Sequence, residues 1–195
     1  DSDFVRHLDI SREETQSLIS GKAEKFDLVI PRGGEALIEF VSKNSKAPVI
    51  VSGRGNNFLY IDDAADFAMA LRIALDGKTR LSVCNALDKI LIHKDLPDID
   101  ACISLLVEAL RGMDIEVFGD EGVHSNNGSV TQIENEQIWF EEFLAAKIVI
   151  GIVDGVFEAV EKINKYSGGH SATIVTANAE IAEKFLQEVD CAAVY

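Results

Sequence analysis

Several residue types are scarce in this sequence. Its 195 residues include only 3 prolines, 1 tryptophan and 3 cysteines, and 18 basic residues face 33 acidic ones. The net charge of −15 disfavours binding to nucleic acid or to anionic lipid, because both are negatively charged. No apolar run approaches the roughly 18 residues of a membrane span, and no basic, then apolar start marks a secretory signal. We therefore expect a soluble, acidic, globular protein with neither a nucleic-acid nor a membrane partner.

The three cysteines, Cys84, Cys102 and Cys191, are odd in number and widely spaced. They form no Cys-x-x-Cys pair, no zinc-ligand set and no disulfide framework, so we expect no metal site. A reducing compartment fits this usage better than an oxidising one. Each thiol then remains available as a small core residue or as a nucleophile.

Short β-branched runs alternate with longer amphipathic patterns along the chain. Strands are predicted at residues 27–31, 48–52, 57–62, 89–93, 115–119, 147–152, 172–176 and 191–195. Helices are predicted at residues 35–44, 63–76, 98–111, 154–166 and 177–189. Most of the strands are apolar throughout, as in a parallel sheet that is covered on both faces. The alternation predicts an α/β fold, a three-layer sandwich around a mostly parallel sheet.

Two regions do not follow this alternation. Residues 120–135 are rich in Gly, Asn and Ser, which predicts a long surface loop. The first 25 residues contain one weak helical stretch, and an apolar strand runs up to the last residue, Tyr195. These features suggest a piece of a longer protein.

The segment KTRLSVCNA, residues 78–86, places Cys84 on an irregular connection between a helix and a strand. Lys78 and Arg80 lie just upstream and would favour the thiolate form of a nearby cysteine. A lone cysteine is more often a small buried hydrophobic residue. Composition and spacing leave both interpretations of Cys84 open.

Three segments resemble one known family. DLVIPRGG (27–34), VCNAL (83–87) and KYSGGHSATIVT (165–176) are similar to gamma-glutamyl phosphate reductase, also called glutamate-5-semialdehyde dehydrogenase, of the aldehyde dehydrogenase superfamily. The resemblance extends from about residue 9 to residue 195. Its most specific part is residues 153–174, where the family pattern is matched at Val153, Ala159, Val160, Ile163, Tyr166, Ser167, His170 and Ser171.

The resemblance implies a reaction as well as an aldehyde-dehydrogenase-like fold. Cys84 would attack the carbonyl carbon of gamma-glutamyl phosphate and form a thioester as phosphate leaves. NADPH would then supply a hydride, giving glutamate-5-semialdehyde on the route from glutamate to proline. The backbone N–H of Cys84 and the neighbouring Asn85 would hold the developing oxyanion.

One absence favours reduction over oxidation. Aldehyde-oxidising relatives carry a glutamate that activates water to hydrolyse the thioester, whereas residues 50–59, IVSGRGNNFL, contain no carboxylate. A reductase that starts from an acyl phosphate gains by excluding that water. An NAD-dependent aldehyde-oxidising dehydrogenase is therefore the less favoured enzyme.

Two glycine turns and one histidine are candidate binding residues. Arg32, Gly33 and Gly34 end a predicted strand and open a helix, where backbone N–H groups could meet a cofactor phosphate; an ordinary strand-to-helix turn is the alternative. Arg54 could meet an anionic substrate or be merely solvated. His170 could contact the substrate phosphate or carboxylate, or hold its own loop.

The resemblance also implies domains and partners. Residues 1–61 would complete a dinucleotide-binding domain, and residues 62–195 would form most of a catalytic domain that is truncated at its C-terminal end. By itself the chain should bind NADPH poorly and show no turnover. The whole protein would be a cytoplasmic homo-oligomer that receives its labile substrate from glutamate 5-kinase.

A catalytically eroded structural or interaction module of the same fold is the rival hypothesis. Its support is a set of departures from the family pattern, which commonly has a Cys–His pair at 57–58. The departing residues are Asn57, Phe58, Lys162, Gly168 and Ala172.

Overall fold

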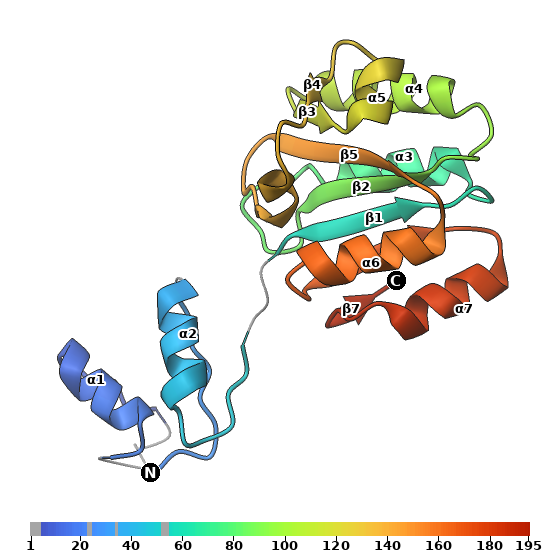
Figure 1. Ribbon diagram of the computed structural model, residues 1–195. Helices are drawn as coiled ribbons and strands as arrows, with labels where there is room; N and C mark the ends of the chain where they lie inside the picture. The colour runs from blue at the N-terminus through green and yellow to red at the C-terminus, as the bar shows by residue number, and fades with distance from the viewer. Residues whose placement is uncertain (1–4, 23–24, 34, 52–54) are drawn as a thin grey trace. The chain divides into compact units, whose positions relative to one another are not determined.

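The computed structural model describes residues 5–22, 25–33, 35–51 and 55–195 (Figure 1). It divides into two compact units, Asp1–Ser52 and Gly53–Tyr195. The domain boundary expected after residue 61 stays a prediction. In the structure β1, Asn57–Ile61, pairs with two strands of the second unit.

The first unit contains two helices, α1 (Arg12–Ile19) and α2 (Glu35–Asn44). A capping box begins α1: the Ser11 hydroxyl accepts from the Glu14 N–H, and the Glu14 carboxylate accepts from the Ser11 N–H. The strands expected at 27–31 and 48–52 are reduced to one parallel bridge between Val29 and Val49. The apolar side chains flanking this bridge are exposed, namely Leu28, Ile30, Ile50 and Val51.

A seven-stranded sheet in the order β4-β3-β5-β2-β1-β6-β7 forms the centre of the second unit, and every pairing is parallel. Besides β1, its strands are β2 (Leu87–His93), β3 (Glu116–Gly119), β4 (Thr131–Gln132), β5 (Lys147–Val153), β6 (Ser171–Val175) and β7 (Ala193–Val194). The predicted α/β class and parallel sheet are confirmed.

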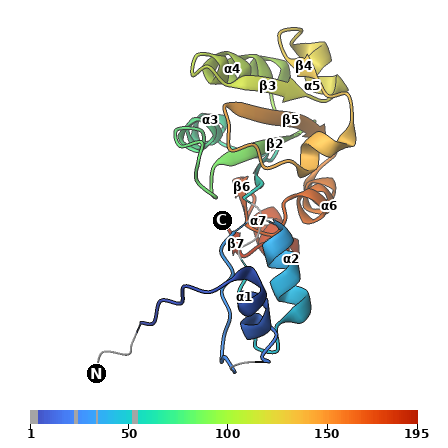
Figure 2. The ribbon, with the colours of Figure 1, turned by 90° about the vertical axis from the view of Figure 1, so that its left-hand side faces the viewer.

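Both faces of this sheet are covered, which explains why its strands are apolar throughout. Alternate residues such as Leu59 and Ile90 pack against α3 (Phe67–Asp76) and α4 (Ile99–Arg111). Their strand neighbours, such as Tyr60 and Leu91, pack against α6 (Val156–Tyr166) and α7 (Ala179–Glu188). Figure 2 shows the resulting layers, with α3 and α6 on opposite sides of the sheet.

The long loop expected at residues 120–135 is wrong in part. That stretch contains the helix α5, Glu121–Asn126, which begins where the Asp120 carboxylate accepts a hydrogen bond from the Val123 N–H. It also contains β4, and the 3-10 helix η1, Glu136–Phe140, follows directly. Within the ranges that the structure describes, no helix is both long enough and apolar enough to cross a membrane.

Candidate active site

The connections that precede β1, β2, β5 and β6 meet at one edge of the sheet, because in a parallel sheet all amino ends lie on the same side. We call this the amino edge. Cys84 lies in the connection before β2, His170 in the one before β6, and Glu142 in the one before β5. The sheet order, rather than closeness in sequence, brings these three residues to one edge.

Cys84 and Asn85 occupy the two central positions of a hydrogen-bonded turn. The N–H of Ala86 donates to the carbonyl of Val83 at 3.0 Å, and both central residues are exposed. Farther out, the Leu87 N–H donates to the Gly77 carbonyl at 2.9 Å and closes the loop between α3 and β2. A thiol on such a turn is open to a reactant, in contrast to a cysteine that fills a core.

Lys78, one of the two cations expected to favour the thiolate, is held by other groups. Lys78 is buried, and its Nζ lies 3.2 Å from Asp88 Oδ1 and 3.4 Å from the Ala145 carbonyl. Burial lowers the pKa of Lys78, while Asp88 acts in the opposite direction. Asp88 also accepts from the Phe143 N–H at 2.9 Å, so the pair joins the cysteine loop to the segment before β5.

Asn57, at the start of β1, makes the largest set of hydrogen bonds at the amino edge. Its Nδ2 donates to the carbonyls of Gly55, Cys84 and Ala86 at 2.7–2.8 Å. Its Oδ1 accepts from the Ser171 hydroxyl at 2.6 Å. This buried carboxamide therefore connects the cysteine turn to the turn that contains His170.

Gly55 is the point of closest approach between backbones at this edge. A Cβ atom there would collide with the carbonyl oxygen of Cys84 and would lie 2.6 Å from Glu142 Oε1. Only glycine fits such a contact. The carboxylate of Glu142 is thus near the cysteine turn, although the two lie far apart in the sequence.

A pocket of about 390 Å³ adjoins the cysteine turn. Asn85 and Leu87 line it from the turn and β2, Ser171 and Thr173 from β6, and Arg72 from α3. His170 is half-buried, immediately before Ser171, and its carbonyl accepts from the Ala193 N–H at 3.1 Å. Of the predicted site residues, Asn85 lines this pocket, and Cys84 and His170 are each one residue away in the sequence from a lining residue.

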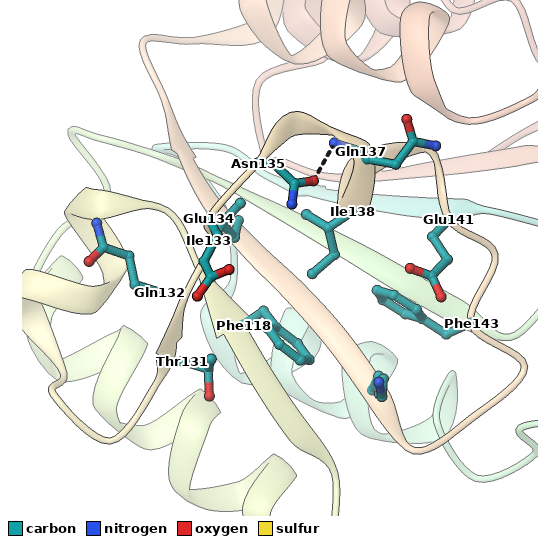
Figure 3. Close-up of a pocket in the computed structure, with 11 residues that line it drawn as sticks. Phe118, Thr131, Gln132, Ile133, Glu134, Asn135, Gln137, Ile138, Glu141 and Phe143 are labelled. Carbon is teal, nitrogen blue, oxygen red and sulfur yellow. Dashed lines mark hydrogen bonds between the residues drawn. The ribbon is translucent and has the colours of Figure 1, made fainter.

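A larger pocket, of about 500 Å³, lies elsewhere on the same unit (Figure 3). The side chains of Phe118, Ile138 and Phe143 reach into it, and Asn135 Oδ1 accepts from the Gln137 N–H at 3.0 Å on its rim. No predicted site residue lines this pocket. Size alone therefore does not identify the site.

The predicted cofactor residues belong to the first unit. Arg32 is exposed, and Gly33 packs closely on α2, because a Cβ there would lie 2.8 Å from Leu37 Cδ2. Gly34 and Arg54 lie outside the described residues. Phosphate binding by this turn and substrate binding by Arg54 stay predictions.

The five departures from the family pattern occupy ordered positions. Phe58 stacks on Trp139 with ring centroids 6.4 Å apart, and Lys162 Nζ lies 5.4 Å from the centroid of the Trp139 ring. Ala172 is buried and pairs with Phe58 across β1 and β6. Gly168 has a φ of 70°, a conformation that suits glycine. With Asn57 in the amino edge, all five are integrated into the fold.

One group of side chains could hold a metal ion by proximity. The ligand atoms of Asp62, Asp63 and His93 lie within 4.8 Å of one another, at the carboxyl ends of β1 and β2. Asp62 already accepts from the Tyr60 and Thr176 hydroxyls, at 2.9 and 2.6 Å. His93 Nδ1 accepts from the Asp95 N–H at 3.0 Å. These hydrogen bonds are sufficient to explain the positions of the Asp62 and His93 side chains.

The three thiols differ in their surroundings. Burial raises the pKa of the Cys102 thiol and of the Cys191 thiol. Both are half-buried and pack against the two cores of the second unit, whereas Cys84 is exposed. Accessibility therefore distinguishes Cys84 as the candidate nucleophile.

The parallel sheet covered on both faces has an aldehyde-dehydrogenase-like fold. An acetylating aldehyde dehydrogenase from Geobacillus thermoglucosidasius superposes with a TM-score of 0.66 at 19% identity, over 94% of this chain and 48% of that one. At this identity the similarity concerns the fold alone.

The resemblance to gamma-glutamyl phosphate reductase is confirmed over nearly the whole chain. The reductase from Clostridium botulinum is 43% identical over 173 residues, which are 88% of this chain and 41% of that protein. The crystal structure of the reductase from Thermotoga maritima has a TM-score of 0.84 at 38% identity, covering 92% of this chain and 44% of that one. No protein-family model matches the chain. The chain spans about two fifths of the length of these relatives.

Proposed function

We propose that the protein to which this chain contributes reduces gamma-glutamyl phosphate to glutamate-5-semialdehyde, in the synthesis of proline from glutamate. The observation that carries the proposal is the exposed Cys84 at the centre of a hydrogen-bonded turn, in a chain 43% identical to a reductase of that name. A cysteine so exposed can act as a nucleophile when it ionises.

The chemistry assigned to Cys84 is acyl transfer. Its Sγ bonds to the γ-carbonyl carbon of the substrate, the bond from that carbon to the phosphate oxygen breaks, and inorganic phosphate leaves with the electron pair. The product on the enzyme is a thioester. NADPH, when bound, supplies the hydride that reduces this thioester to the aldehyde. Arg32, Gly33 and Gly34 are the proposed contacts for its phosphates.

The remaining roles follow from the same resemblance. Asn85 beside Cys84 stabilises the oxyanion, and Arg54 and His170 bind the anionic groups of the substrate. The full protein works in the cytoplasm as a homo-oligomer and takes its unstable substrate from glutamate 5-kinase. The chain alone, with about two fifths of the relatives' length, is expected to show no turnover.

The experiment that tests this proposal compares the full-length protein with its Cys84→Ala and Cys191→Ala variants. Glutamyl phosphate is generated in situ, and NADPH oxidation is followed by absorbance. We expect Cys84→Ala to lower the rate by about a thousandfold or more, and Cys191→Ala to retain most of it. Equal activity of the wild type and Cys84→Ala would contradict the proposal.

Thiol alkylation provides a second test on the chain itself. Cys84 should react with iodoacetamide at least about tenfold faster than Cys102 and Cys191, because those two thiols are half-buried and hold their protons more tightly. Equal and slow reaction of all three thiols in the folded chain would favour the eroded module instead.

A further inference from the structure

Two adjacent asparagines at the amino edge are both buried but serve different parts of the backbone. Asn56 Nδ2 donates to the carbonyls of Trp139 and Tyr166 at 2.7 and 2.8 Å. Asn57 Nδ2 donates instead to Gly55, Cys84 and Ala86. Asn56 thus binds backbone carbonyls of η1 and of the end of α6, whereas Asn57 binds those at the cysteine turn.

The hydrogen bonds of Asn57 fix the direction of one peptide group in that turn. In a trans peptide the C=O and N–H bonds point in opposite directions. Asn57 holds the Cys84 carbonyl at 2.8 Å, so the N–H of Asn85, in the same peptide plane, is directed away from Asn57. A strong hydrogen bond to the carbonyl of a peptide group also polarises the N–H of the same peptide group and makes it a better donor.

The carboxamide of Asn57 is itself held in one orientation. The Ser171 hydroxyl donates to its Oδ1 at 2.6 Å, which requires the Nδ2 group to face the cysteine turn. Asn57 is only 4% exposed, so water does not readily replace these bonds. Ser171, Asn57 and the Cys84 carbonyl thus form one connected chain from β6 to the turn.

We propose that Asn57 is a positioning residue for acyl transfer to Cys84: it fixes the Cys84–Asn85 peptide so that the thiol and the adjacent N–H groups face the substrate together. The proposal rests on the proposed role of Cys84 as nucleophile. It assigns a catalytic purpose to a residue that the family pattern alone marks as a departure.

The test compares two reactions of Cys84 in the full chain. Acetyl phosphate, a small acyl phosphate, forms a thioester with the thiolate and releases phosphate, a step that needs a stabilised oxyanion. Iodoacetamide alkylates the same sulfur by displacement and needs no oxyanion. Mass spectrometry of the peptide that contains Cys84 measures both rates at one pH.

Asn57→Asp is the informative variant, because it keeps the shape and removes the donors. We expect it to slow acetylation of Cys84 by about tenfold or more, and to change alkylation by less than about threefold. Ser171→Ala keeps the carboxamide and frees its orientation, so an intermediate loss of acetylation is expected.

Asn56→Asp is the matched control, with the same substitution one residue earlier at a similarly buried site. It should lower stability yet leave the ratio of acetylation to alkylation near that of the wild type. If both aspartate variants change that ratio equally, or if Asn57→Asp slows the two reactions equally, Asn57 has only a structural role and the proposal fails.

Hydrogen exchange tests the positioning role of Asn57 separately from the proposed role of Cys84 as nucleophile. If wild-type Cys84 is not acetylated at all, the proposed function is contradicted. The positioning role of Asn57 is then tested by hydrogen exchange at the backbone amides of residues 84–87. These amides should exchange about tenfold faster in Asn57→Asp than in Asn56→Asp. Equal exchange in the two variants would overturn it.

Discussion

The two edges of the sheet in the second unit bury different polar side chains. At the amino edge, buried donors bind backbone carbonyls: Asn57 binds three, Asn56 two, and Lys89 Nζ donates to the Glu141 carbonyl at 2.8 Å. At the carboxyl edge, the buried carboxylate of Asp62 accepts from the Tyr60 and Thr176 hydroxyls.

The difference follows from what each edge contains. The amino-edge connections are irregular, so their buried carbonyls find no partner in the strand ladder and need side-chain donors. Those donors lie at or beside the amino ends of β1 and β2, and they hold the connections firmly enough to present a reactive side chain. Substitutions at the amino edge should therefore lower the free energy of unfolding more than substitutions at the carboxyl edge.

The largest expected effect comes from Lys78→Met at the amino edge. The variant leaves the Asp88 carboxylate buried without its ion pair, which should lower the free energy of unfolding by about 3–5 kcal/mol. Urea unfolding followed by circular dichroism measures the loss.

The matched control is Lys94→Met at the carboxyl edge, where the ion pair with Asp154 at 3.0 Å is exposed. It should leave the unfolding midpoint unchanged, since exposed pairs contribute little. The double variant Lys78→Met with Asp88→Asn should regain most of the lost stability. A similar loss in both lysine variants would remove the contrast between the edges.

Gly55→Ala should have the next largest effect. The added methyl group would collide with the Cys84 carbonyl, so the cysteine turn must move, at a cost of about 2–3 kcal/mol. Gly128→Ala is the control, because a Cβ there meets nothing within 4 Å. Thermal unfolding of the two variants tests this, and equal midpoints would show that the amino edge tolerates displacement.

The sequence predicts the sheet well and the amino edge poorly, for one physical reason. Apolar runs such as 147–152 are read directly from periodicity, and β5 begins at Lys147 as predicted. Burial of Lys78, Asp88 and Lys89 cannot be read this way, since charged residues are normally exposed. Their burial depends on backbone carbonyl and N–H groups contributed by segments more than 50 residues away.

The candidate site, too, could be predicted from the sequence only in part. Cys84 and Asn85 follow from a motif, and the irregular connection expected there is an exposed turn in the structure. Asn57 appears there only as a departure from the family pattern, because three of its four partners are backbone carbonyls that have no signature in sequence. The pair Asn56–Asn57 before an apolar strand is the one local signal, since amides are rarely placed beside a core without hydrogen-bond partners.

The smallest expected effect, counted per pH unit, is a pH dependence at the amino edge. Lys89 is fully buried, its Nζ lies 3.9 Å from the centroid of the Phe143 ring, and burial lowers its pKa to about 7. In the unfolded chain a lysine titrates near 10.4. Between these values the unfolded state binds the extra proton, so stability should rise with pH, by at most about 1.4 kcal/mol per unit.

The measurement compares the wild type with Lys89→Met between pH 7 and 9.5, below the range in which unfolded tyrosines ionise. The variant has no proton to bind at this position, so its free energy of unfolding should increase less steeply with pH than that of the wild type. Lys78, whose pKa burial also lowers, contributes a slope of the same sign in both proteins. Cys102 and Cys191, whose thiol pKa burial raises, contribute a slope of the opposite sign in both proteins. Parallel curves would mean that Lys89 stays charged, held by the Glu141 carbonyl and the Phe143 ring. The amino edge would then tolerate a buried ammonium without penalty.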